Sequence, residues 1–198
     1  MQNFNWKKLI PWALLGILVL WSISKYNSIV AKDQEVKRTW GDVESDYQRR
    51  TDLIPNLVNT VKGYADFEKE TLTQIVEARA KATSVNIDPS NLTPEKLAQF
   101  QQAQDGVGSA LGRLMVVMEK YPDLKANQNF LDLQAQLEGT ENRISVSRKR
   151  FNEAVGVYNT AIKGFPGVLI AAIGGYTEKG YFKAAEGADK APTVDFSK

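Results

Sequence analysis

The sequence contains no histidine and no cysteine in 198 residues. These two absences exclude imidazole bases, thiol nucleophiles, disulfides and the commonest protein ligands of transition metals. A catalytic site would have to be built from carboxylates, lysine, serine, threonine or tyrosine alone. We therefore expect no enzymatic activity, no metal site and no cofactor.

An excess of charge of one sign is also lacking, because 25 basic side chains face 23 acidic ones and the net charge is +2. Proteins that bind nucleic acid normally carry a basic stripe with interleaved aromatic residues, and the sequence has no such stripe. Nucleic acid is therefore not an expected partner. The length allows one hydrophobic core and is too short for two comfortable domains.

Long apolar runs are scarce, and the one that stands out covers residues 9–24, between Lys8 and Lys25. As a helix it would be about 24 Å long, a little less than the ~30 Å hydrocarbon core of a bilayer. Lysine snorkelling and local thinning can cover the difference. We expect a retained transmembrane anchor over 9–24, preceded by a short segment over 1–8. A cleaved signal peptide is the main alternative, although no Ala-x-Ala pattern follows the run; a core helix of a soluble protein is another.

The expected location is the bacterial inner membrane, crossed once. Lysines directly before an N-terminal anchor usually keep the short end in the cytoplasm, which would place the remaining domain outside it. Basic residues after the anchor, from Lys25 to Arg38, work against this orientation.

Beyond the anchor, apolar residues recur at spacings of three and four, the period of one helix face. The spacing predicts four helices over about 29–62, 67–83, 94–121 and 130–164, with turns near 63–66 and 121–123. Nothing before residue 36 breaks a helix, so the anchor and the first helix are expected to form one rod. Pro55 should kink this rod without ending it.

The sequence also predicts where the helices begin and which of their side chains face the core. Thr93 is expected to be the N-cap and Pro94 the first residue of the third helix. The inward positions predicted for the second helix are Leu72, Ile75, Val76 and Ala80. Those predicted for the fourth helix are Phe130, Leu133, Leu137, Thr140, Ile144, Ser147, Phe151, Ala154, Tyr158 and Ala161.

These elements predict an all-α fold: an N-terminal transmembrane helix followed by an antiparallel four-helix bundle over 25–165. Residues 166–198 are expected to form a short apolar turn and a mostly extended tail. The tail should lie on some surface because it carries several aromatic residues.

Several long motifs resemble those of the LemA family. They are QRRTDLIPNLV over 48–58, VKGYA over 61–65, EARA over 77–80, YPDLKAN over 121–127 and FLDLQAQLEGTENRI over 130–144. The resemblance covers about residues 26–165 in order, and the tail agrees only loosely. It implies an N-terminal anchor, a soluble antiparallel four-helix bundle and no established enzymatic activity.

Arg49 and Arg50 beside Asp52 could form a clamp for phosphate or a lipid headgroup, because guanidinium groups bind phosphate through two hydrogen bonds. The favoured interpretation is structural: Arg50 pairs with Glu138 or Glu141 on a facing helix and fixes the register. Paired carboxylates can also act in acid–base catalysis, but no second set of converging groups accompanies them.

Surface contacts are the remaining candidates. The mixed charges from Lys32 to Glu44, Asp33 among them, would be solvated or would contact another copy. A second, shorter apolar run over residues 168–173 could belong to the base of the core or press on lipid or a neighbouring subunit. The residues singled out as an interaction or structural motif are Arg49, Arg50, Asp52, Pro55, Glu138, Glu141, Val168, Leu169, Ile170, Tyr176 and Phe182.

These features predict a non-catalytic membrane protein that self-associates into a scaffold and organises or remodels the bilayer. The alternative is a membrane-anchored adaptor that recruits a protease or a signalling protein. The expected partners are membrane lipid, further copies of the chain and an unidentified protein.

Overall fold

The computed structural model describes residues 10–63 and 68–184, and all regular secondary structure within these ranges is helical. The all-α prediction is therefore confirmed. The helices are α1 (Ile10–Lys62), α2 (Lys69–Ser84), α3 (Pro94–Met118), α4 (Pro122–Lys125), α5 (Gln128–Lys163) and α6 (Gly167–Gly174).

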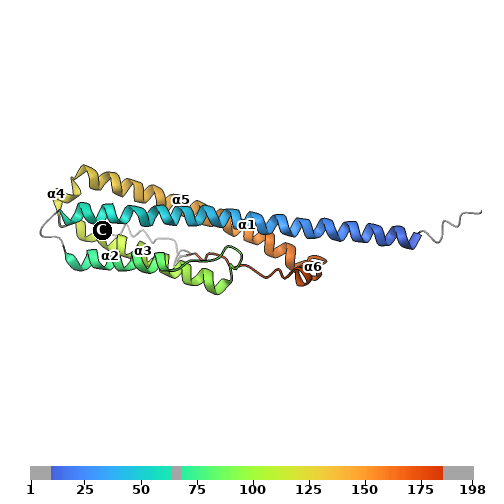
Figure 1. Cartoon of the computed structure of the whole chain (residues 1–198). Coiled ribbons are helices and arrows are strands. Elements are labelled where there is room, and N and C mark those ends of the chain that lie inside the picture. The colour runs from blue at the N-terminus through green and yellow to red at the C-terminus, as the bar shows by residue number, and fades with distance from the viewer. Residues whose placement is uncertain (1–9, 64–67, 185–198) are drawn as a thin grey trace, which may run out of the picture.

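Helix α1 joins the apolar run and the first bundle helix in one element of 53 residues. It continues through Pro55 and ends at Lys62, just before Gly63. Its first part stands clear of the other helices, and from Ile29 onward one side is buried (Figure 1). The expected single rod is thus present.

Side-chain caps set the start of α3 and α5. The hydroxyl of Thr93 accepts a hydrogen bond from the backbone N–H of Lys96 at 3.4 Å, and Pro94 is the first helical residue, as predicted. Asn127 caps α5 in the same way, accepting from the N–H of Phe130 at 3.1 Å. The turn expected at 121–123 is instead the short helix α4, because Pro122 is well placed at a first helical position.

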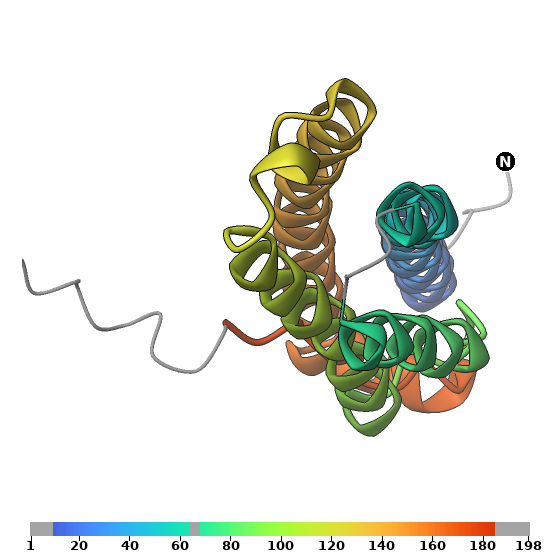
Figure 2. The same ribbon diagram turned by 90° about the vertical axis from the view of Figure 1, so that its left-hand side faces the viewer.

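The four long helices α1, α2, α3 and α5 run in alternating directions along a common axis (Figure 1). Viewed along that axis, α1, α2, α3 and α5 surround a shared interior (Figure 2). Helix α5 packs along α1, and α2 packs along α3. This is the packing expected of an antiparallel bundle.

The interior contains two hydrophobic clusters along the axis. The first is nearer to the apolar end of α1, and its largest side chains are Trp40, Tyr47, Phe100, Phe151, Tyr158 and Phe182. The second lies at the far end and includes Ile54, Leu57, Ile75, Leu114, Leu124 and Phe130.

Two predicted inward faces need correction. In α5 the buried positions shift from Ala154 and Ala161 to Val155 and Ile162. A straight helix has 3.6 residues per turn, so a face drawn with a seven-residue repeat drifts by about 20° per repeat. In α2, Val76 is exposed, and Thr71 and Ala82 are buried in addition to Leu72 and Ile75; Ala80 is exposed as well.

The shorter apolar run over residues 168–173 forms a two-turn helix, α6, which packs against α1 and α5. Residues 175–184 follow without helix or strand and run back along the bundle (Figure 1). We call them the strap. The turn expected over 64–66, the N-terminal segment 1–8 and the tail beyond 184 lie outside the described residues.

Candidate functional site

A polar layer separates the two hydrophobic clusters, and Arg50 of α1 is its centre. Its side chain is 3% exposed. Nη1 donates to Oε2 of Glu141 on α5 at 2.9 Å, and Nη2 donates to the backbone and side-chain oxygens of Gln104 on α3 at 2.8 and 2.9 Å. Tyr47 covers the guanidinium with its ring, 5.0 Å away. One arginine therefore ties three helices at one level.

This layer fits a structural role for Arg50 because the guanidinium is enclosed by protein. Burial raises the pKa of Tyr47, whose ring covers it. The layer also joins α2, since Nε of Arg79 donates to the carbonyl of Thr51 at 2.9 Å. Buried polar layers of this kind specify register more reliably than they add stability.

The other candidates of this group do not converge on Arg50. Arg49 and Pro55 lie exposed on the outer side of α1. Asp52 accepts from Nε2 of Gln48 at 2.7 Å, and Glu138 accepts from Gln134 within α5. The structure thus brings together Arg50 and Glu141 but not Arg49, Asp52 and Glu138.

The strap is held by side-chain amides that bond to its backbone. Asn159 accepts from the N–H of Lys179 and donates to its carbonyl, at 3.0 and 2.9 Å. Asn152 does the same for Phe182, at 2.9 Å for both bonds. Each amide satisfies one donor and one acceptor, as a neighbouring β-strand would.

The other side of the strap is held by α3 and the loop before it. Gln101 makes the same paired bonds to Lys183, both at 3.0 Å. Gly180 donates to the carbonyl of Leu92 at 2.9 Å. A Cβ on Gly180 would lie 2.7 Å from Cα of Pro94, so only glycine fits there.

A buried ion pair joins the strap to α1. Nζ of Lys179 lies 2.9 Å from Oδ1 of Asp33, and Nζ of Lys37 lies 2.8 Å from Oδ2 of the same carboxylate. Burial by itself would raise the pKa of Asp33, but the two ammonium groups outweigh it and hold the pKa below its ordinary value. The expectation that Asp33 belongs to a solvated or intersubunit face is therefore wrong.

Phe182 fills an aromatic cluster in the bundle. Its ring stacks on Trp40 at 6.2 Å between centroids and meets Phe151 edge to face at 5.5 Å. Arg148 covers it from outside, 4.9 Å from the ring. Phe182 is thus part of the core. This aromatic residue of the predicted tail packs on the bundle of its own chain.

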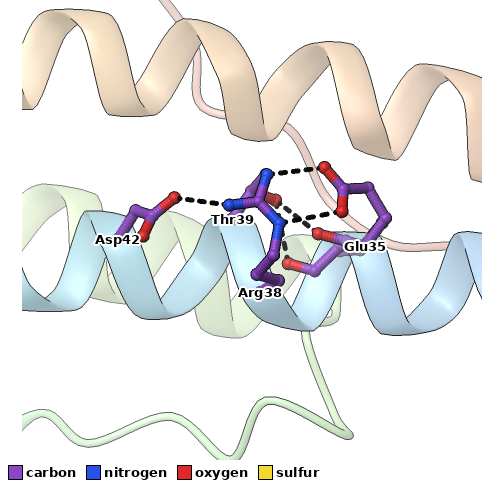
Figure 3. Close-up of polar contacts among 5 residues, drawn as sticks. Glu35, Arg38, Thr39 and Asp42 are labelled. Carbon is purple, nitrogen blue, oxygen red and sulfur yellow. Dashed lines mark hydrogen bonds and ion pairs between the residues drawn. The ribbon is translucent and has the colours of Figure 1, made fainter.

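A shallow groove between α1 and α5 gathers charges of both signs. Arg38 binds both oxygens of Glu35 and also Asp42, and each of the three side chains is about half exposed (Figure 3). The hydrogen bond from Arg38 lowers the pKa of Glu35. Across the groove lie Arg143 and Arg150, together with the exposed apolar residue Val157.

Helix α6 leaves apolar side chains uncovered. Val168 and Leu169 are exposed, Ile170 is half-buried, and Ala171 is buried against the bundle. Tyr176, which follows α6, meets the ring of Tyr26 on α1 at 6.1 Å. Burial, followed by the Tyr26 hydroxyl, raises the pKa of Tyr176 to about 12.

Within residues 10–63 and 68–184, no three acidic side chains come close enough to hold a metal ion. A small pocket of about 160 Å³ beside the polar layer is lined mainly by neutral residues, with Glu44 and Tyr47 as its titratable groups.

One helix of the described structure, α1, is long and apolar enough to cross a membrane. The apolar window lies near the N-terminus and is almost entirely exposed, unlike the core helix of a soluble protein. The exposed window is consistent with a membrane protein.

Sequence comparison identifies the family of this chain. The sequence profile of the LemA family matches residues 39–196, which is most of the chain. The chain belongs to the LemA family. The LemA match begins in α1 after the apolar window and includes both the polar layer around Arg50 and the strap.

Two kinds of curated relative align with this LemA family member. Magnetosome protein MamQ of Magnetospirillum gryphiswaldense is 26% identical over 184 aligned positions, covering 84% of this chain and 68% of the relative. Protein LemA of Metamycoplasma hominis is 24% identical over 151 positions, covering 76% of this chain and 65% of the relative. The chain therefore spans about two thirds of the length of each.

Sequence reasoning missed the strap contacts of this LemA family member. The signal that could have found them is the pair Asn152 and Asn159, which lie two helical turns apart on α5. Residues seven apart share a helix face, and two amides on one face can bind an extended backbone.

Proposed function

We propose that this chain is a non-catalytic, single-pass protein of the bacterial inner membrane whose bundle self-associates into a scaffold that organises the bilayer. The observation that carries the proposal is the continuity of α1, one helix of 53 residues from the apolar window to the far end of the bundle. Such a helix couples the position of the bundle directly to that of the membrane segment. The proposed location of the bundle is outside the cytoplasm.

Self-association is supported by the groove between α1 and α5. It presents both acidic groups, Glu35 and Asp42, and basic groups, Arg143 and Arg150. A surface with both signs can be complementary to a second copy of itself in the two-fold arrangement common among homo-oligomers. Membrane-anchored copies share one plane, which raises their effective concentration.

The absence of catalysis is supported by the site's geometry. The buried polar groups of the described residues are used to hold helices or the strap together, as Arg50 and Asn159 show. Apart from Nε of Arg50 and Nε1 of Trp40, the buried side-chain donors and acceptors of the described residues have hydrogen-bond partners within the protein.

The first experiment is to measure the mass of the full-length protein in detergent by light scattering, with the detergent contribution subtracted, together with electron microscopy. The scaffold proposal expects large, regular particles. A monomer or dimer that co-purifies with another protein in fixed stoichiometry would instead support the adaptor.

A matched pair of variants tests the groove. Val157 lies in the groove and Val116 lies on α3, and both side chains are more than half exposed at 56% and 72%. We expect Val157→Glu to reduce the particle mass and Val116→Glu to leave it unchanged. Equal effects of the two substitutions would show that the groove is not the contact.

A further inference from the structure

Helix α6 lies across the base of the bundle, next to the point where the apolar window of α1 ends. Its axis makes an angle of 98° with α5. Ala171 of α6 shares a buried cluster with Ile29 of α1, and Tyr176 meets Tyr26 just after α6 ends. Tyr26 directly follows Lys25, the first charge after the apolar run over residues 9–24.

This position fixes the orientation of α6 relative to a membrane. Helix α5 packs antiparallel along α1, so a helix nearly perpendicular to α5 is also nearly perpendicular to α1. If α1 crosses the bilayer close to its normal, α6 lies in the plane of the interface. Its eight residues correspond to about 12 Å, which is too short to cross the hydrocarbon core.

The side of α6 that faces away from the bundle is apolar. Leu169 and Ile173, four residues apart in α6, are 57% and 90% exposed, and Phe165, which precedes the helix, is 84% exposed. The opposite side carries small residues, and a Cβ on Gly167 would lie within 2 Å of the carbonyl oxygen of Ala161. The backbone of α6 therefore lies directly on α5, Ile170 packs against the core, and Leu169 and Ile173 remain exposed.

No charge interrupts this surface. The sequence from residue 164 to residue 177 contains no charged side chain. The charges at its two ends, Lys163 and Glu178, pair with each other at 2.6 Å. Exposed apolar surface of this kind normally marks a contact with another apolar phase.

We propose that α6 is a membrane-interface helix: its exposed side chains Leu169 and Ile173, with Phe165 just before the helix, enter the boundary between headgroups and acyl chains of the leaflet from which α1 emerges. The inference rests on the proposed membrane insertion of α1. Interfacial helices lie in this boundary with their apolar side about 5–10 Å deep. Lipid is the occupant because α6 adjoins the end of the membrane-spanning segment.

The inference also accounts for the short apolar window. Ile10 to Ser24 of α1 would be about 22 Å long, which is less than the ~30 Å of a hydrocarbon core. A helix seated in the interface beside it adds apolar surface where the span ends and holds the base of the bundle against the membrane. The chain then has two membrane contacts, α1 and α6.

The test uses single cysteines, because the natural chain contains none. Leu169→Cys and Ile173→Cys in the full-length protein are labelled with a nitroxide and placed in vesicles of phosphatidylcholine and phosphatidylglycerol. Collision rates with oxygen, which concentrates in lipid, and with a water-soluble nickel chelate then report the surroundings. Val19→Cys is the reference for lipid, and Val116→Cys on α3 is the reference for water.

We expect the labels on α6 to favour oxygen several-fold more than the label at Val116, and less than the label at Val19. Preference for the nickel chelate on α6, with Val19 in lipid, overturns the inference and leaves the proposed function standing. A label at position 19 that is accessible to the nickel chelate overturns both the inference and the proposed function. Dipolar broadening between α6 labels that disappears on dilution with unlabelled protein would identify a second copy as the occupant and overturn the lipid contact.

A second variant separates lipid contact from folding. The double variant Leu169→Glu, Ile173→Glu also carries Phe165→Cys, which is labelled with the nitroxide. This label should become accessible to the nickel chelate. The two substituted side chains point outward, so the circular dichroism of the bundle should not change. Unchanged protection of the label at position 165 would contradict the proposal.

Discussion

The ammonium group of Lys179, in the strap, lies 2.9 Å from the carboxylate of Asp33, in α1, and both residues are buried. Lys179 also approaches the ring of Tyr158, with Nζ 5.2 Å from its centre. The pair fastens the end of the described chain to the first bundle helix. Its strength should therefore control whether the strap stays in place.

The two partners of this pair should respond unequally to substitution. Asp33→Leu removes the counter-charge of buried Lys179, and we expect it to lower the free energy of unfolding by about 3–5 kcal/mol. Lys179→Met leaves Asp33 paired with Lys37, so a smaller loss of about 1–2 kcal/mol is expected. Guanidinium unfolding of the full-length protein in detergent, followed by circular dichroism, measures both. The exposed Lys96→Met is the control, and a larger loss for Lys179→Met would contradict the prediction.

Acid should weaken the strap through Asp33. Its pKa is below the ordinary 3.8 in the folded protein, so its stabilising contribution is fully present above the unfolded pKa. The contribution is lost as the pH falls below about 4 toward the folded pKa. Other carboxylates, including Glu35, add to the acid sensitivity, so the measurement is the difference in stability between the natural chain and Asp33→Asn. That difference should shrink between about pH 5 and pH 2; a constant difference would exclude this origin.

Gly180 is predicted to be the most sensitive glycine of the strap. Gly180→Ala places a methyl group against the backbone of Pro94 and should displace the strap, whereas Gly112→Ala in α3 meets open space. We expect tryptic cleavage after Lys179 to accelerate about tenfold or more in the first variant, since each 1.4 kcal/mol changes a population tenfold. Gly112→Ala should stabilise the protein by about 0.5–1 kcal/mol. Equal cleavage rates in the two variants would show that the strap tolerates a side chain there.

The polar layer should depend on Arg50 far more than on Glu141. Arg50→Ala leaves two buried oxygens of Gln104 without their donor and should cost about 3 kcal/mol or more. Glu141 is 60% exposed, so Glu141→Gln should cost less than about 1 kcal/mol. Thermal or denaturant unfolding measures the two values. Similar losses for both would mean that the ion pair, and not the contact with Gln104, dominates the layer.

The sequence allowed the helices to be predicted because their signals are local. The three-four spacing around Trp40, Leu97 and Phe151 and the cap at Thr93 depend on residues within a few positions of each other. Arg50 was recognised as well, because a charge on an apolar face requires a partner. The errors at Ala154 and Ala161 arose where a small residue beside a larger one lay at the edge of that face.

The strap contacts could not be predicted in the same way. Asp33 stands among charged residues on α1, and only the return of the chain at Lys179 buries it. No residue near position 33 in the sequence indicates that the C-terminal part of the chain packs there. Likewise, Phe182 is one of several aromatic residues in a glycine-rich tail, and its place beside Trp40 depends on contacts far apart along the chain.

The continuity of α1 makes the bundle a lever. From Lys25 to Lys62 the helix is about 57 Å long at 1.5 Å per residue. A change of about 10° in the tilt of the membrane segment would move the far end of the bundle sideways by about 10 Å. In the proposed scaffold, bilayer thickness or curvature, which sets that tilt, would thereby alter the spacing between the far ends of neighbouring copies.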